Sequence, residues 1–229
     1  MRVHCFASAG EILYQTIHYI AYVFTRVLPA IIAGNQDELD EMLKRLRGNV
    51  EWVMLDFMDG SFVASTALMF DIRLQKGLRY EAHLMVKQPL DYLEKLKGKT
   101  EAVIVHVESD DFTEALKKAR GLGFEVAAAV NPGTPLEKLK SRLKEVDRVL
   151  VMTVEPGRYG APFVPGALET VKRLRKLAPN LPIEVDGAMN PENAKKARAA
   201  GANIFASGSY LMKSVDLPAA IKVLKEAVE

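Results

Sequence analysis

Two carboxylates and one imidazole stand at the ends of three short apolar segments of the chain. Asp56 ends the segment 52–55, and the turn signal Asp59-Gly60 follows three residues later. His83 and Asp186 end comparable segments. A single residue of this kind is better explained as a turn cap or a hydrogen-bonded polar group. Because the pattern recurs at three equivalent strand ends, and because an unpaired carboxylate there is costly, we interpret the trio as a functional site.

The chemistry available to this trio is of two kinds, and the residues alone leave both open. Asp56, His83 and Asp186 together offer oxygen and nitrogen ligands for a divalent metal. The two carboxylates are equally suited to act as an acid/base pair in proton transfer.

The trio can meet only if the strands that precede its members run side by side. From Val27 onward, apolar segments alternate with amphipathic ones through eight strand–helix units, of which the second has a weak helix. Strands are expected at 27–32, 52–56, 78–83, 102–107, 125–130, 148–152, 182–185 and 202–206. Helices are expected at 36–47, 89–97, 111–121, 135–144, 165–178, 191–200 and 215–228.

This alternation predicts an α/β fold, a closed (β/α)₈ TIM barrel with parallel strands and right-handed crossovers. A doubly wound open sheet is the alternative, but it would normally carry a glycine-rich fingerprint after the first strand, where Ala33-Gly34-Asn35 has one glycine. In a barrel, the carboxyl ends of the strands form one face, so Asp56, His83 and Asp186 are expected to converge there.

Small residues follow the last two expected strands. Gly187 and Ala188 come directly after Asp186, and Gly208-Ser209 follows the final strand. Such residues expose backbone N–H groups before helices, where anions bind, and the loops after strands seven and eight of such barrels commonly hold phosphate. Gly157 and Gly160 are candidates for further N–H donors, although any single glycine is better explained by an ordinary turn.

Composition narrows the class of protein. The chain has 229 residues, a formal net charge of +2 and one cysteine, Cys5. It therefore forms no intrachain disulfide and suits a reducing compartment, which predicts a cytoplasmic protein. The charge argues for neither nucleic acid nor membrane as a partner. Nothing marks a second domain, so 27–229 is expected to be one barrel domain.

Residues 1–26 do not share the pattern and are expected to form an N-terminal extension. A rough apolar stripe at 12–24 is too short and too polar for a membrane span. It lacks the features of a secretory signal, and it lacks the basic residues that favour a membrane-surface anchor. A helix resting on the barrel, or sequence upstream of the natural start, is the preferred interpretation.

From about Val27 to Glu229, the chain resembles the ribulose-phosphate 3-epimerase family. The matching stretches occur in the family's order and cover nearly the whole expected barrel. They are Leu-Asp-Phe-Met-Asp-Gly-Ser-Phe-Val at 55–63, Ala-His-Leu-Met-Val at 82–86, Val-His-Val-Glu at 105–108, Asn-Pro-Gly-Thr-Pro at 131–135, Val-Leu-Val-Met-Thr-Val-Glu-Pro-Gly at 149–157, Glu-Val-Asp-Gly at 184–187 and Gly-Ser at 208–209. Each stretch is weak alone, and the set is specific.

The resemblance implies an isomerase that interconverts D-ribulose 5-phosphate and D-xylulose 5-phosphate through an enediolate. It implies that Asp56 and Asp186 transfer the protons and also bind a divalent cation (Zn, Fe or Mn), with His83 as the third ligand. The substrate is a phosphorylated ketopentose, and homo-oligomerisation is left open. The implied substrate-binding residues are Met58, His83, Met85, Met152, Gly157, Arg158, Tyr159, Gly160, Gly187, Ala188, Gly208 and Ser209. For the three methionines, core filling explains their presence equally well.

Four departures from the family's pattern all fall at the expected site. Met54 stands where the family usually has a further histidine ligand, and Ala30 stands where it has a serine that contacts substrate. Gly157-Arg158-Tyr159-Gly160 replaces a more glycine-rich phosphate loop, and Ala188 replaces a glycine. Three ligands with water can still hold a metal, but weaker binding or its loss are alternatives. Arg158 could pair with phosphate directly.

Three functions are therefore compatible with the sequence. The preferred one is an epimerase with a reduced metal site. The second is an isomerase of another phosphorylated sugar, and the third is a non-catalytic phosphosugar-binding barrel. The opposed carboxylates favour catalysis, since a pure binding protein does not need them.

Overall fold

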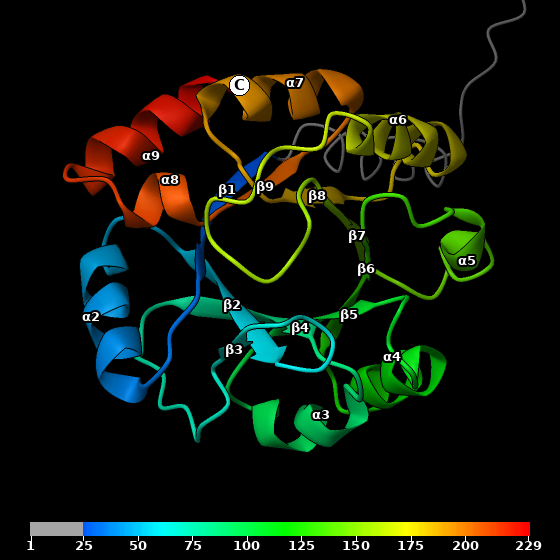
Figure 1. Cartoon of the computed structure of the whole chain (residues 1–229), viewed down its shortest axis with the longest axis horizontal. Coiled ribbons are helices and arrows are strands. Elements are labelled where there is room, and N and C mark those ends of the chain that lie inside the picture. The colour runs from blue at the N-terminus through cyan, green and yellow to red at the C-terminus, as the bar shows by residue number, and fades with distance from the viewer. Residues whose placement is uncertain (1–24) are drawn as a thin grey trace, which may run out of the picture.

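A computed structural model describes residues 25–229, and its strands form a closed barrel (Figure 1). Parallel pairings run around the ring in the order β1-β9-β8-β7-β6-β5-β4-β2, and a β1–β2 pairing closes it. The predicted TIM barrel is confirmed, and the open sheet is wrong because β1 has a neighbour on each side. The strands of the ring are β1 (Arg26–Ile31), β2 (Trp52–Asp59), β4 (Arg79–Met85), β5 (Ala102–His106), β6 (Glu125–Val130), β7 (Arg148–Met152), β8 (Ile183–Asp186) and β9 (Ile204–Ser207).

Helices surround the ring and pack their apolar faces on its outer surface. In the first of them, Leu39, Leu43 and Leu46 lie on one face and are buried. The side chain of Asn35 caps its start by accepting a hydrogen bond from the backbone N–H of Glu38. The helices are α2 (Gln36–Leu46), α3 (Leu90–Leu96), α4 (Phe112–Gly121), α5 (Glu137–Lys140), α6 (Ala167–Leu177), α7 (Pro191–Ala200), α8 (Ser209–Met212) and α9 (Leu217–Glu226).

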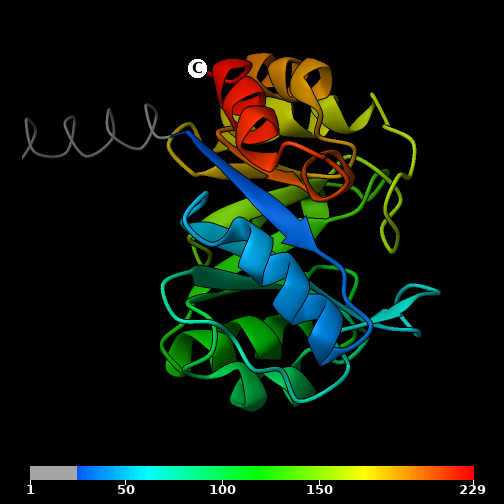
Figure 2. The same cartoon turned by 90° about the vertical axis from the view of Figure 1, so that its left-hand side faces the viewer.

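The second strand–helix unit differs from the others. Between β2 and β4, the described chain forms no helix, and the short strand β3 (Thr66–Ala67) pairs antiparallel with the end of β2. Figure 2 shows this arm projecting from the end of the barrel toward which β1 points. The expected weak second helix is therefore wrong. Because β2 runs on through Asp59 before it turns back, the chain has only residues 68–78 left for the return to β4.

The helix expected at 135–144 is also shorter than predicted. After Lys140, the backbone N–H groups of Arg142 and Glu145 bond to carbonyls three residues earlier, so the chain continues as tight turns. Leu139 is the buried anchor of this segment. A single helical turn suffices to cover the barrel here.

Alternation along β2 decides which side chains reach the inside of the barrel. Val53, Leu55 and Phe57 belong to the core between the strands and the helices, whereas Trp52 and Met54 belong to the core inside the ring. Asp56 has the same parity as Trp52 and Met54, so it also points inward. Its position on the strand thus places the carboxylate inside the barrel near its carboxyl end.

The opposite, amino-terminal half of the barrel interior holds a buried ion cluster. Arg148 donates from Nε to Glu184 over 2.9 Å, and its two terminal nitrogens donate to Glu81 and Glu125. Three carboxyl groups around one guanidinium satisfy a charge that would otherwise be costly to bury, and burial raises the pKa of Glu81 well above its ordinary value, which opposes an excess of negative charge. The cluster lies one inward layer below His83 and Asp186, because Glu81 and Glu184 precede them by two residues on β4 and β8.

Among the described residues, no helix is long and apolar enough to cross a membrane. The stripe at 12–24, and the helix expected for it, lie outside the described residues.

Candidate active site

Asp56, His83 and Asp186 converge inside the carboxyl end of the barrel. Asp56 and His83 are direct neighbours in the register of β2 and β4, and Asp186 comes from β8. The Nδ1 atom of His83 lies 3.0 Å from Oδ1 of Asp56 and 3.8 Å from Oδ2 of Asp186. All three side chains are buried. The convergence expected from the three strand ends is thus present in the structure.

Burial and mutual repulsion make two carboxylates at this place difficult to ionise together. Burial, followed by the negative charge of Asp56, raises the pKa of Asp186 to about 7. Burial alone would lower the pKa of His83, but the hydrogen bond and charge of Asp56 outweigh it, so the pKa is raised. The cluster therefore attracts positive charge, either as protons or as a bound cation.

The donor set is suited to a divalent metal ion. One ligand atom from each of Asp56, His83 and Asp186 lies within 4.8 Å of the other two. Carboxylate oxygen with imidazole nitrogen suits Zn²⁺, Mn²⁺ and Fe²⁺. Three protein ligands also leave coordination positions for water or substrate, as catalytic sites require. On this chemistry, the residues present fit such an ion.

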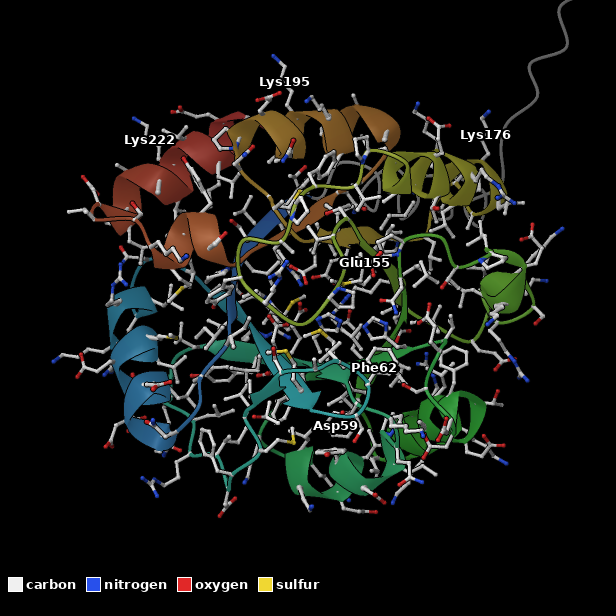
Figure 3. The ribbon with its side chains drawn as sticks, in the orientation of Figure 1. Asp59, Phe62, Glu155, Lys176, Lys195 and Lys222 are labelled. Carbon is white, nitrogen blue, oxygen red and sulfur yellow. The ribbon has the colours of Figure 1, made fainter. Side chains whose placement is uncertain are left out.

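A small cavity opens from the trio toward the loops after β7, β8 and β9. Its volume is about 40 Å³. Figure 3 shows Phe62 and Glu155 over this end of the barrel, on the loops that follow β2 and β7. Predicted site residues that line the cavity are Asp56, Met85, Met152, Gly157, Arg158, Tyr159, Gly160, Asp186, Gly187, Ala188, Gly208 and Ser209.

Two predicted substrate-binding residues, Met58 and His83, are not among the residues that line this cavity. Met58 packs against Met85, Val63 and Ala67 in a small apolar cluster beside the cavity. His83 is fully buried behind the two carboxylates. The structure therefore brings the loops expected to bind phosphate together with the two carboxylates. It places His83 beside Asp56 and Asp186 and packs Met58 against Met85.

The match to known proteins agrees with this geometry. Residues 26–212 match the model of the ribulose-phosphate 3 epimerase family. The chain belongs to this family. It is 33% identical over 215 residues to the "Ribulose-phosphate 3-epimerase, cytoplasmic isoform" of Oryza sativa subsp. japonica, covering 89% of this chain and 94% of that one. It is 33% identical over 208 residues to the ribulose-phosphate 3-epimerase of Synechocystis, covering 85% and 90%.

Solved structures support the same architecture. The 3-hexulose-6-phosphate synthase of Salmonella typhimurium superposes with a TM-score of 0.64 at 12% identity, covering 89% of this chain and 98% of that one. At this identity the likeness concerns the fold alone, and it confirms the barrel.

Within the epimerase family, the substitution at Met54 affects the trio's surroundings. Met54 is fully buried in the inner core, two residues before Asp56 on the same face of β2. It stands opposite Glu81 in the register with β4. Its thioether offers neither nitrogen nor carboxylate oxygen, so it adds no donor atom of the kind that the trio offers.

Tyr159 lies in the loop after β7, and its side chain reaches across the cavity to the end of β1. Its hydroxyl donates to the carbonyl oxygen of Ala30 over 2.7 Å and accepts from the backbone N–H of Ile32 over 2.9 Å. A Cβ on Gly208 would lie 2.6 Å from its ring. Burial, followed by the charge of Asp56, raises the pKa of the phenol. The sequence placed Tyr159 only in a phosphate loop, and nothing in its spacing indicated β1.

The loop after β8 keeps a glycine-like backbone although Ala188 replaces glycine. Ala188 has a φ of 52°, in the left-handed region, and Gly187 has a φ of 110°. A Cβ on Gly187 would lie 2.4 Å from a methyl group of Val154. Gly187 is therefore required by both conformation and space, whereas Ala188 tolerates its conformation at a cost of about 1–2 kcal/mol.

Two further polar residues, His106 and Glu108, stand behind the trio, and neither is among the residues predicted to form the site. Nε2 of His83 lies 2.9 Å from Nε2 of His106, and Nδ1 of His106 lies 3.2 Å from Glu108. Burial lowers the pKa of His106 to about 4. Burial opposes ionisation of Glu108, but hydrogen bonds from His106 and Thr134 outweigh it and lower the pKa of Glu108. The His-x-Glu spacing at the end of β5 was the available signal.

Proposed function

We propose that this protein is a ribulose-phosphate 3-epimerase that interconverts D-ribulose 5-phosphate and D-xylulose 5-phosphate. The observation that carries the proposal is the pair Asp56 and Asp186, which reach one cavity from β2 and β8 with His83 between them. Inversion at a carbon next to a carbonyl needs a base on one face and an acid on the other. Membership of the family supports this assignment.

The two carboxylates are suited to opposite roles. Because its pKa is raised to about 7, Asp186 can hold a proton near neutral pH, whereas Asp56 lies beside Nδ1 of His83. One carboxylate takes the proton from C3, and the other returns a proton to the opposite face. For the reverse reaction, the roles exchange.

We infer that Asp56, His83 and Asp186 would also hold a divalent cation. When bound, such an ion would supply positive charge close to the oxygen that becomes negative as the C3 proton leaves. Met85 and Met152 line the same cavity with apolar groups, which limit access of water to the reacting carbon. The metal dependence of turnover distinguishes Zn²⁺, Fe²⁺ and Mn²⁺.

The phosphate is assigned to the loops after β7, β8 and β9. Gly187, Ala188, Gly208 and Ser209 are small residues at the cavity, so backbone N–H groups can approach a phosphate oxygen closely. Arg158 on the facing loop adds a positive charge. The distance between this group and the carboxylates sets which carbon of the sugar is presented to them.

An isomerase of another phosphorylated sugar is the second candidate, and Tyr159 favours it. Its ring occupies space between Ala30 and Gly208, where the family pattern has a serine hydroxyl and a more open loop. A changed wall of the cavity can alter which pattern of sugar hydroxyl groups is accepted.

Residues 27–229 would act as one domain. The single cysteine, together with a relative named as a cytoplasmic isoform, supports a cytoplasmic location.

The test follows conversion of D-ribulose 5-phosphate by the purified chain after chelator treatment, with and without added Zn²⁺, Mn²⁺ or Fe²⁺. Turnover by the wild type, and its loss in Asp56→Asn and in Asp186→Asn, is the expected result. Parallel assays with other ketose phosphates test the second candidate. Binding of a phosphosugar without turnover under every metal, and without weakening by Asp56→Asn, would leave a non-catalytic binding protein.

A further inference from the structure

A line of four polar side chains, three of them buried and the last partly exposed, runs from the cavity into the barrel wall. Asp56, His83 and His106 come from the neighbouring strands β2, β4 and β5, and Glu108 follows β5 directly. The three links are 3.0 Å from Asp56 to His83, 2.9 Å from His83 to His106 and 3.2 Å from His106 to Glu108. Proton transfer at the sugar uses only the first member, so the outer two call for a separate explanation.

The geometry of the two imidazoles is that of a direct N–H···N hydrogen bond. Their ring centroids are 5.0 Å apart and their planes differ by 18°, so the rings lie end to end and nearly coplanar. The ring of Phe62 lies 4.8 Å from that of His106 and tilts across it. Both histidines have no exposed surface, so bulk water does not compete for this hydrogen bond.

The direction of the hydrogen bonds is fixed at the outer end. Glu108 accepts on one oxygen from the backbone N–H of Asn131 over 2.9 Å, and its other oxygen faces Nδ1 of His106. A carboxylate only accepts, so His106 must carry its proton on Nδ1. A neutral imidazole then has a bare Nε2, and this atom must accept the proton of His83 Nε2.

The consequence reaches the cavity. With its proton on Nε2, a neutral His83 presents a lone pair at Nδ1, the atom that faces Asp56 and Asp186. When these groups release the protons that they share in the metal-free chain, three acceptor atoms meet in a buried space, and a shared cation is what such a set requires. We propose that His106 and Glu108 are positioning residues that hold His83 in this tautomer and thereby set the divalent-cation affinity of the trio.

This inference rests on the metal site of the proposed function, and a variant of Glu108 tests it without measuring turnover. In Glu108→Gln, the amide oxygen is expected to keep the bond from Asn131 N–H, and the amide NH₂ then faces Nδ1 of His106. The hydrogen bond between residue 108 and His106 and the one between His106 and His83 then both reverse direction. Nε2 of His106 becomes a donor toward His83. A metal on Nδ1 of His83 would then force two N–H groups against each other.

The measurement is competition for Zn²⁺ between the chain and a chelator indicator. We expect Glu108→Gln to bind Zn²⁺ about 10- to 100-fold more weakly than the wild type. Asp110→Asn is the matched control, because it removes the same charge from the same loop at a side chain that is 54% exposed and 3.9 Å from Lys87. Its Zn²⁺ affinity should equal that of the wild type. Equal affinity in Glu108→Gln and Asp110→Asn would overturn the inference.

A second measurement uses ¹⁵N chemical shifts of the imidazoles and stands even if a variant folds poorly. In the wild type, His106 should show a protonated Nδ1 and a bare Nε2, and Glu108→Gln should exchange the two. A wild type with its His106 proton on Nε2 contradicts the proposal. If the wild type turns over substrate but binds no divalent ion, the proposal about His106 and Glu108 is wrong and the epimerase assignment stands. If the wild type binds the ion but does not turn over substrate, only the epimerase assignment is wrong.

Discussion

The hydroxyl of Tyr159 bonds both backbone groups that flank Ile31, accepting from Ile32 N–H at 2.9 Å and donating to the Ala30 carbonyl at 2.7 Å. One side chain from the loop after β7 thereby fastens that loop to the end of β1, on the far side of the cavity. The cavity beneath it, at about 40 Å³, is far smaller than the roughly 300 Å³ at which small-molecule pockets begin. We therefore expect this loop to move when a sugar phosphate binds.

Replacing Tyr159 with phenylalanine should loosen the loop while keeping the ring. The partly buried N–H of Ile32 then loses its acceptor, which costs about 1 kcal/mol in the free energy of unfolding. Urea denaturation measures this loss, and amide exchange of Ile32 should accelerate. Tyr92→Phe is the control, because its hydroxyl makes only a 3.4 Å contact to the sulfur of Met69. Equal losses in the two variants would contradict the proposed fastening.

Restoring histidine at Met54 should strengthen cation binding. The position shares the inner face of β2 with Asp56, so the new imidazole adds a fourth ligand. We expect Zn²⁺ affinity to rise by about tenfold or more and kcat to rise with it, since the ion would be bound more completely. Met54→Gln, which is of similar length without an imidazole, should not tighten binding. A Met54→His variant no tighter than the glutamine control would show that residue 54 lies outside the coordination sphere.

The stability of the metal-free chain should fall as pH rises, and Asp186 should account for part of the fall. In the folded chain, burial and the neighbouring Asp56 raise the pKa of Asp186 from 3.8 to about 7, with Glu81 adding to the rise and His83 opposing it. Between these two values, the folded state holds a proton that the unfolded state has released, so its advantage is present at pH 4 and lost by about pH 7.

Urea unfolding of the chelator-treated wild type and of Asp186→Asn across this range measures the effect. The free energy of unfolding of the wild type should fall relative to the variant by at most about 1.4 kcal/mol per pH unit. Parallel curves for the two proteins would show that Asp186 ionises normally. Added Zn²⁺ should restore the wild type most strongly above pH 7, where Asp186 no longer holds a proton.

Placing a negative charge at Ser209 should repel the substrate's phosphate. We expect Ser209→Asp to raise KM at least tenfold with a smaller effect on kcat, because the phosphate lies away from the reacting carbon. Ser214→Asp adds the same charge beyond α8, at a residue outside the cavity lining, and should leave KM unchanged. An unchanged KM in Ser209→Asp would remove the loop after β9 from the phosphate site.

The barrel and the meeting of Asp56, His83 and Asp186 could be predicted because both follow from local pattern. Apolar segments ending in one polar residue mark the carboxyl ends of buried strands, and a parallel barrel brings those ends to one face. No knowledge of side-chain contacts was needed for that step. The structure adds the distances, which place one imidazole nitrogen between two carboxylates.

The remaining features depend on relations that a single sequence does not display. His106 reaches His83 although the register pairs His83 with Ile104, because neighbouring barrel strands are tilted and staggered. Tyr159 reaches Ala30 through a loop whose path no periodicity describes. The stretch after β2 had no clear pattern, and the structure replaces its expected weak helix with β3 and an irregular return.

Because this helix is absent, the outer surface of the barrel is not covered evenly by helices. In Figure 1, irregular chain passes outside β2 where other strands are covered by a helix. A hollow of about 520 Å³ lies between residues of this segment, β2 and α3. Apolar side chains line it, including Phe57, Leu68, Phe70 and Leu96. Local opening begins where apolar contacts are fewest, so this seam should part before the rest of the barrel. This region packs against the outer side of β2, the strand that carries Asp56. A cation or sugar phosphate bound to Asp56 would therefore stabilise β2 from inside the barrel, where no helix covers its outer side.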